Sequence, residues 1–311
     1  MKKILFLIFI SLLSCTAQKE KPNTMREVLQ PYHFKTRFVS LKDGELAYTK
    51  EGNGKNVLIF VHGLSSNADA WYRNIEDLQK DFTCYAIDLP GYGKSYLKAS
   101  EYTPTYFAET IREFAEKMNV QKFTVVGHSM GGQTAIKFAS KYPEKLDRMI
   151  LIAPAGIEEF TEFEGNTMKM VTTKGAIMNT SDEQIDKNYA INFFKMPQEA
   201  NRMIADRKAI KNTDDFEQHA EAIVGSVHGM LNDKVIADLE KITVPTLLLF
   251  GKNDFLIPNR YLHAAMAVDD VAGKAKTALK GSQLQMIENA GHFLMFEKPQ
   301  EVNHAVRAFL K

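Results

Sequence analysis

Ser129 has the clearest potential for chemistry in this chain, because it lies in Gly127-His128-Ser129-Met130-Gly131, which fits G-x-S-x-G. An apolar, β-branched run, Phe123–Val126, comes directly before this stretch, and a helical pattern follows it. A strand, a tight turn and a helix in this order hold a serine hydroxyl clear of the backbone, beside a helix N-terminus that favours negative charge. We therefore predict that Ser129 is a nucleophile; the alternative is a glycine-rich turn with an incidental serine.

A serine hydroxyl is a weak nucleophile unless a base activates it. Of the eight histidines, His292 is the best placed, because it follows the strand pattern Leu284–Ile287 in a loop, Asn289-Ala290-Gly291-His292-Phe293. His128 lies inside the serine turn and should point away from Ser129. The remaining histidines fall on helical patterns, near the chain ends or in the loop at His62.

The base in turn needs a carboxylate that orients it. Asp254 follows the apolar run Thr246–Phe250, so it should emerge at the same edge of a parallel sheet as Ser129 and His292. Asp269 and Asp270 are weaker candidates because they follow a helical pattern. The alternative for Asp254 is a surface turn with no chemical role.

Acyl transfer also needs two hydrogen-bond donors for the oxyanion that forms in the transition state. We expect these to be the backbone N–H groups of Met130, which follows the nucleophile, and of Leu64, in the loop after Val57–Val61. We also place His62, Gly63 and Trp71 at the substrate pocket. His62 has the alternative of shaping its loop, and Trp71 that of packing against a helix.

The elements that must position these residues alternate between strand and helix. Arg37–Leu41 and Glu45–Lys50 flank a turn, Lys42-Asp43-Gly44, that predicts a hairpin. Continuous apolar runs predict buried strands of a parallel sheet; besides those already named they are Thr83–Ile87 and Met149–Ile152. Helical patterns cover Tyr106–Met118 and Met130–Lys141. The fold class is therefore α/β, with a mostly parallel sheet flanked by helices.

The alternation stops between residues 155 and 243, where we predict a helical cap inserted into a core formed by residues 31–154 and 244–311. Ser181-Asp182-Glu183-Gln184 opens one of its helices and Thr213-Asp214-Asp215 another. Methionines and phenylalanines in this region either line an apolar acyl pocket or form the cap's own core. They are Met168, Met170, Met178, Met196, Met203, Met230, Phe160, Phe163, Phe193, Phe194 and Phe216.

The N-terminus has the pattern of an export signal. Lys2 and Lys3 precede an apolar run, Ile4–Leu13, that is shorter than the roughly 20 residues a membrane-spanning helix needs. The run ends at Cys15, which resembles the lipidated cysteine of bacterial lipoproteins. We predict residues 1–15 as a lipoprotein signal ending at Cys15, residues 16–30 as a tether, and an exported, membrane-anchored protein. An ordinary signal peptide and a short membrane anchor are the alternatives.

Composition excludes other classes of function. Lysine and arginine total 39 against 38 aspartates and glutamates, so the net charge is only +1 and no nucleic-acid partner is expected. The remaining cysteine, Cys84, lies in an apolar run and is predicted to be a buried core residue.

Taken together, the motifs resemble the α/β-hydrolase superfamily, in its serine esterase or lipase-like form with a helical cap. The stretches that carry the resemblance are Val61-His62-Gly63, Asp88–Ser95, Gly127–Gly132, Gly251-Lys252-Asn253-Asp254 and Gly291-His292-Phe293. They occur in the family's order, and so do Ser129, Asp254 and His292. Ser129 stands where the related dehalogenases and epoxide hydrolases carry an aspartate. His62-Gly63-Leu64-Ser65 departs from the Gly-Gly-Pro-Gly stretch usual in proline iminopeptidases.

The resemblance implies a hydrolase that needs no metal and no organic cofactor. We expect it to cleave carboxylic esters of small or medium apolar acyl groups through an acyl-enzyme. One alternative is carbon–carbon hydrolysis, as in meta-cleavage product hydrolases, which needs a cationic subsite that Arg202, Arg207 or Lys208 would supply. The other is a hydrolase fold that binds a ligand without catalysis.

Overall fold

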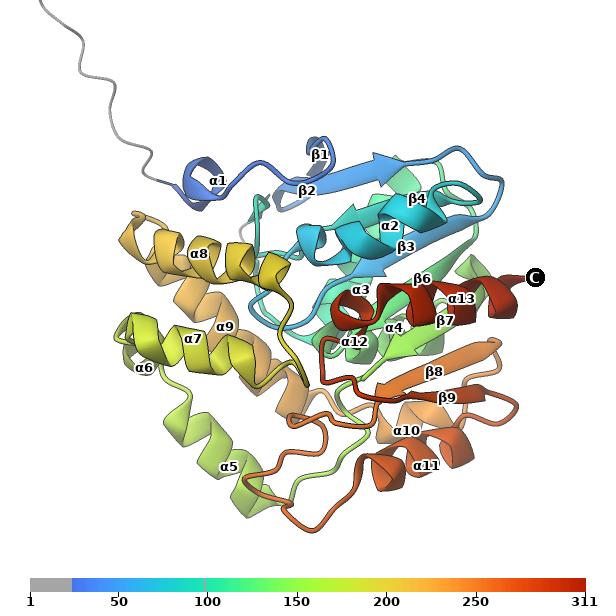
Figure 1. Cartoon of the computed structure of the whole chain (residues 1–311). Coiled ribbons are helices and arrows are strands. Elements are labelled where there is room, and N and C mark those ends of the chain that lie inside the picture. The colour runs from blue at the N-terminus through green and yellow to red at the C-terminus, as the bar shows by residue number, and fades with distance from the viewer. Residues whose placement is uncertain (1–23, 98) are drawn as a thin grey trace, which may run out of the picture.

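A computed structural model describes residues 24–97 and 99–311 of the chain (Figure 1). The predicted signal segment, Cys15 and the first part of the predicted tether lie outside the described residues. Among those described, no helix is both long and apolar enough to cross a membrane.

A single mixed sheet forms the centre of the molecule. Within the described ranges it has nine strands, eight of them in the order β1-β2-β4-β3-β6-β7-β8-β9, while β5 pairs with β2. The first two pairings along this order are antiparallel, and the remainder are parallel. The strands are β1 (Arg37–Leu41), β2 (Gly44–Glu51), β3 (Val57–Val61), β4 (Thr83–Ile87), β5 (Tyr96–Leu97), β6 (Phe123–His128), β7 (Leu146–Ile152), β8 (Thr246–Gly251) and β9 (Gln283–Ile287). The predicted fold class is confirmed.

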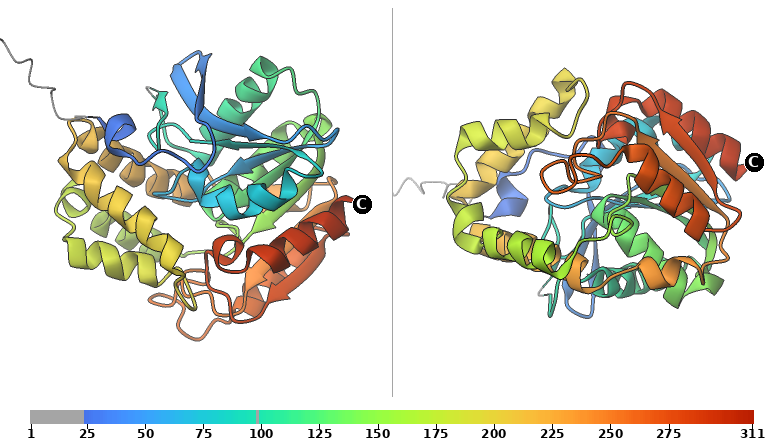
Figure 2. Two further views of the ribbon diagram at one scale, coloured as in Figure 1. Left: turned by 45° about the horizontal axis from the view of Figure 1, so that its top comes forward. Right: turned by 90° about the horizontal axis from the view of Figure 1, so that it is seen from below.

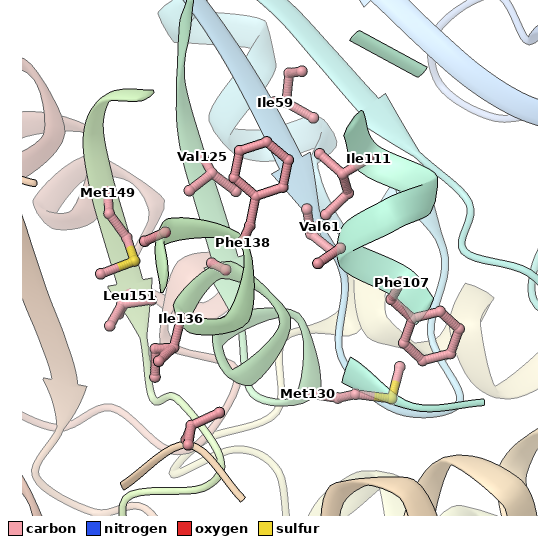
Figure 3. Close-up of a cluster of buried hydrophobic side chains, with 14 of the residues drawn as sticks. Ile59, Val61, Phe107, Ile111, Val125, Met130, Ile136, Phe138, Met149 and Leu151 are labelled. Carbon is pink, nitrogen blue, oxygen red and sulfur yellow. The ribbon is translucent and has the colours of Figure 1, made fainter. Parts of the chain in front are cut away.

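Helices cover both faces of this sheet, because side chains of its central strands alternate between two apolar layers. One layer joins the strands to α3 (Pro104–Lys117), α4 (Met130–Lys141) and α11 (Val268–Ala278). Figure 3 shows part of it, where Ile59, Val125 and Met149 from three strands meet Phe138 of α4. Since Phe138 is fully buried, its replacement by alanine should cost about 3–5 kcal/mol.

The other layer lies on the opposite face. It packs α2 (Tyr72–Leu78), α12 (Leu294–Glu297) and α13 (Pro299–Leu310) against the sheet. Cys84 belongs to this layer and is fully buried, as predicted. The two layers hold the strand ends rigidly, and the loops that follow those ends carry the candidate site.

Residues between β7 and β8 form the cap, which extends from one end of the sheet (Figures 1 and 2). Its helices are α5 (Glu162–Val171), α6 (Lys174–Met178), α7 (Asp182–Ala190), α8 (Asn201–Ala209) and α9 (Phe216–Asn232). A short helix, α10 (Ile236–Leu239), leads back to the core. Ser181 caps α7 through its side chain, which accepts a hydrogen bond from the backbone N–H of Gln184.

The prediction of a tether up to residue 30 is wrong for its last part. The short helix α1 (Met25–Val28) packs on the cap, where Met25 and Leu29 are buried against Ile210 and Phe216. The backbone N–H of Met25 also donates to Asp215 Oδ1 at 2.8 Å. The physical reason is the apolar spacing of Met25, Val28 and Leu29, which gives even one helical turn a face that can be buried.

Candidate active site

Ser129 occupies the sharp turn between β6 and α4. Its backbone has φ 53° and ψ −118°, in a region that residues other than glycine seldom adopt. The turn is held on both sides: the Ser129 N–H donates to Ile152 O at 3.0 Å, and its carbonyl oxygen accepts from Gly132 N at 2.8 Å. Strain that the surrounding hydrogen bonds maintain in this way is typical of a serine held as a nucleophile.

Asp254 and His292 meet, although 38 residues separate them in the chain. Asp254 Oδ2 lies 2.8 Å from His292 Nδ1, and both side chains are buried. Asp254 Oδ1 accepts from the backbone N–H groups of Leu256 at 2.8 Å and Ile257 at 3.0 Å, which fixes the carboxylate. With Nδ1 bound to Asp254, Nε2 is the ring nitrogen of His292 left to act as a base.

Ser129 and His292 line the same cavity, which measures about 820 Å³. Gly63 and Leu64 line it as well, on the side of the loop after β3. Gly63 must be a glycine here, because a Cβ at this position would lie 2.9 Å from His128 Nδ1 and 3.1 Å from Ser129 Cβ. Leu64 follows directly in the same loop. Met130 begins α4, and its side chain is buried in the core (Figure 3), which leaves only its backbone for an oxyanion.

His62 and Trp71 do not lie where we expected them. Neither is among the described residues that line the cavity, and both are fully buried. Burial lowers the pKa of His62 to about 4, so the ring is neutral; its Nδ1 donates to Gly63 O at 2.7 Å and its Nε2 accepts from Leu89 N at 3.0 Å. These bonds hold the loop in shape. Trp71 packs on Phe60 beneath the sheet surface, at 5.1 Å between ring centroids.

His128 is a residue that sequence analysis undervalued. Its Nε2 donates to the backbone oxygen of His292 at 3.0 Å, and the two rings lie 4.7 Å apart. Burial, followed by repulsion from His292, holds the pKa of His128 well below its ordinary value, so the ring stays neutral. His128 therefore positions the loop of His292. The only signal in the sequence was its place beside Ser129.

The wall of the cavity is mainly apolar. Three of the cap residues named from the sequence line it, Phe160, Met168 and Met230. The other apolar lining residues are Leu64, Pro154, Ala155, Val227, Leu231, Ile236, Leu256, Ile257 and Phe293. The remaining named cap residues lie elsewhere; Phe193 and Phe216, for example, are buried within the cap or against the core.

The expected cationic subsite is not formed by the expected residues. Arg202 reaches Pro31 O and Asp69, Arg207 is buried beside the ring of Phe216, and Lys208 pairs with Asp186. None of the three is among the described residues that line the cavity. Lys169 and Lys234 do line it, and Lys169 Nζ donates to Asn232 Oδ1 at 2.6 Å.

Apart from His128 and His292, a further histidine, His263, contacts two carboxylates where the chain enters the cap. His263 Nδ1 is 2.5 Å from Glu158 Oε1, and its Nε2 is 3.2 Å from Glu164 Oε1. Burial alone would lower the pKa of His263, but the two carboxylates outweigh it and raise the pKa above the ordinary value. The cluster joins α5 to the loop that follows Asp254. Sequence analysis missed it because 105 residues separate His263 from Glu158.

The arrangement can be compared with known proteins. The chain is 27% identical to monoacylglycerol lipase abhd6-A of Xenopus laevis over 291 residues, covering 88% of this chain and 81% of that protein. It superposes on a probable hydrolytic enzyme of Pseudomonas aeruginosa with a TM-score of 0.82 at 20% identity, covering 93% of this chain and 98% of that one. A bacterial membrane phospholipase A gives 0.71 at 26% identity, with 89% and 85% covered.

A family model described as the α/β hydrolase fold matches residues 56–299. This range holds Ser129, Asp254 and His292, the cap, and the strands that position them. The chain therefore belongs to the α/β-hydrolase family, and it is a hydrolase with esterase- and lipase-like relatives.

Proposed function

We propose that this hydrolase cleaves carboxylic esters of small or medium apolar acyl groups, with Ser129 as nucleophile. The observation that carries the proposal is the strained Ser129 in one cavity with His292, whose other ring nitrogen is held by Asp254 at 2.8 Å. The apolar wall of that cavity suits an acyl chain. The resemblance to a lipase and to a phospholipase supports an ester as the bond that is cleaved.

In the proposed mechanism His292 Nε2 takes the proton of Ser129 as Oγ attacks the acyl carbon. The N–H groups of Leu64 and Met130 stabilise the oxyanion, each by roughly 3–4 kcal/mol. His292 then gives the proton to the leaving alcohol, which departs and leaves an acyl-Ser129. Water, deprotonated by His292, attacks this ester and releases the acid, restoring the serine.

Replacing the nucleophile tests this assignment. Ser129→Ala should reduce kcat on a short p-nitrophenyl ester by about 10⁴-fold or more and abolish labelling by a fluorophosphonate probe. Ser40→Ala, on an exposed position of β1, is the matched control and should change neither. Labelling that persists in Ser129→Ala would refute the role of this serine. A dienoate diketone in the same assay tests the carbon–carbon alternative. Arg202, Arg207 and Lys208, which were expected to bind its carboxylate, are not among the described residues that line the cavity.

We also propose that the protein is exported and lipidated at Cys15. The support is the sequence alone, an apolar run that stops where this cysteine stands. Globomycin treatment, or Cys15→Ala, should leave an unprocessed precursor in cells. Normal processing under either condition would contradict the assignment.

A further inference from the structure

Helix α5 carries an apolar face that no part of the described chain covers. Phe163, Met170 and Val171 are 80%, 72% and 62% exposed. Their spacing of seven and eight residues places them on one side of the helix. We call these three residues the outer face of α5. None of the ten residues of α5 is buried, so the helix does not contribute these side chains to the cap's core.

The opposite side of the same helix lines the cavity. Gly165, Asn166, Met168 and Lys169 are all lining residues. Nearby, Glu164 of α5 contacts His263. Tyr261, two residues before His263 in the chain, is 77% exposed and contacts the ring of Phe255, which is 41% exposed. The wall between the cavity and the solvent is thus one helix thick, and its outside is apolar.

We propose that the outer face of α5 docks on the surface of a lipid bilayer. Exposed apolar clusters on a protein surface mark sites of contact with a partner or a membrane. An amphipathic helix that lies in the interface needs only one apolar face and no complementary partner. A second copy of this chain fits less well, since a ten-residue helix is only about 15 Å long and a stable dimer buries on the order of 1,000 Å² or more.

The N-terminal sequence indicates the same orientation. The apolar run Ile4–Leu13 connects to α1, and α1 packs on the cap beside α8 and α9 (Figure 1). The eight residues from Thr16 to Asn23 can span at most roughly 26–29 Å. A membrane anchor before them therefore keeps the cap, rather than the far end of the sheet, close to the bilayer. α5 belongs to that same cap, at its other end (Figures 1 and 2).

Docking through α5 deepens the proposed function, on which this step rests. It places the cavity wall against the bilayer, so the substrates would be membrane-resident amphiphiles whose ester group enters past α5. The apolar wall would take the acyl chain.

A fluorescent label tests the docking itself, independently of catalysis. Phe163→Cys in the full chain, bound to phosphatidylcholine vesicles, is labelled with an environment-sensitive dye; Lys117→Cys, exposed on α3, is the matched control. Cys84 is buried, and the unsubstituted protein, which carries Cys15 as well, gives the background from both. We expect brominated lipid to quench the label at residue 163 at least threefold more than the label at 117. Equal quenching would overturn the proposal. Shielding from aqueous iodide without quenching by brominated lipid would overturn it in favour of a second copy of the chain.

An activity measurement tests the consequence. The combined variant Phe163→Ser, Met170→Ser, Val171→Ser should lose about tenfold or more of its activity on a medium-chain ester of an amphiphile held in vesicles, and keep its activity on a short soluble ester. Tyr96→Ser, a 74% exposed aromatic residue of β5 and outside α5, should keep both. Equal effects on both substrates, or none, would overturn the proposal. A wild type that hydrolyses neither ester would instead contradict the proposed function, while the quenching result would stand on its own.

Discussion

Two helices of the cap, α9 and α5, are attached to the rest of the molecule in different ways. α9 has seven buried residues among its seventeen, whereas α5 has none among its ten. Both helices line the cavity, α9 through Val227 and Met230 and α5 through Met168. The cap therefore combines a helix that is part of the core with a helix that is attached mainly by polar contacts at its two ends.

Buried polar contacts explain the firm attachment of α9. The Tyr92 hydroxyl lies 2.7 Å from Ser226 Oγ and 3.1 Å from Ala222 O, and His219 Nδ1 donates to Gly91 O at 2.9 Å. These contacts join α9 to the loop Asp88–Ser95. α5 has instead its own N-terminal capping box at Thr161, the contact of Glu164 with His263, and the hydrogen bond of Lys169 to Asn232. The comparison predicts that equal changes in the two helices have unequal effects.

Glycine-to-alanine substitutions give the largest expected contrast. A Cβ at Gly229 of α9 would lie 2.2 Å from the backbone oxygen of Tyr102, whereas a Cβ at Gly165 of α5 would meet nothing within 4 Å. Gly229→Ala should therefore destabilise the protein by about 2 kcal/mol, since overpacking outweighs the gain in helix propensity. Gly165→Ala should stabilise it by up to about 1 kcal/mol. Chemical denaturation of the two variants measures both values, and similar values for both would contradict the comparison.

Removing the Tyr92 hydroxyl should have a smaller effect. Tyr92→Phe leaves the buried Ser226 hydroxyl without this partner, so we expect a loss of about 1–2 kcal/mol in the free energy of unfolding. The double variant with Ser226→Ala should recover part of that loss, because the unpaired hydroxyl is then gone. Additive losses in the two single variants and the double variant would show that this contact does not hold α9.

Much of the core could be predicted from the sequence because it follows a periodic pattern. The strands Val57–Val61 and Thr83–Ile87 have the predicted bounds, since a strand buried on both faces is a continuous apolar run with polar residues at its ends. The contact of Asp254 with His292 could be anticipated for a related reason. Loops that follow parallel strands emerge at one edge of the sheet, whatever the distance along the chain.

The errors concern side chains whose direction depends on distant partners. His62 turns from the cavity because Leu89 N and Gly63 O bind its ring, and Trp71 packs inward on Phe60. The contact of His263 with Glu158 gave no periodic signal at all. The place of a loop in the sequence predicts the edge of the sheet at which its residues lie. The direction of each side chain, however, is set by tertiary contacts that no local pattern encodes.

The smallest predicted effect concerns pH and the end of α5. The raised pKa of His263 means that its contribution is fully present below the unfolded value near 6.5 and is lost as the pH rises through the folded pKa, where the neutral ring can donate to only one carboxylate. Amide exchange in α5, corrected for its intrinsic pH dependence, should therefore become roughly two- to fivefold faster at alkaline pH. α9 is the internal reference, because burial lowers the pKa of His219, which attaches this helix to Gly91, to about 4, outside this range.

His263→Gln should remove this pH dependence in α5 and leave α9 unchanged. His304→Gln, at an exposed position of α13, is the matched control and should behave as wild type. If α5 and α9 loosened together with rising pH, the cap would open as one body. If neither changed, the His263 contacts would not hold α5, and the capping box at Thr161 together with the contact of Lys169 with Asn232 would hold it instead.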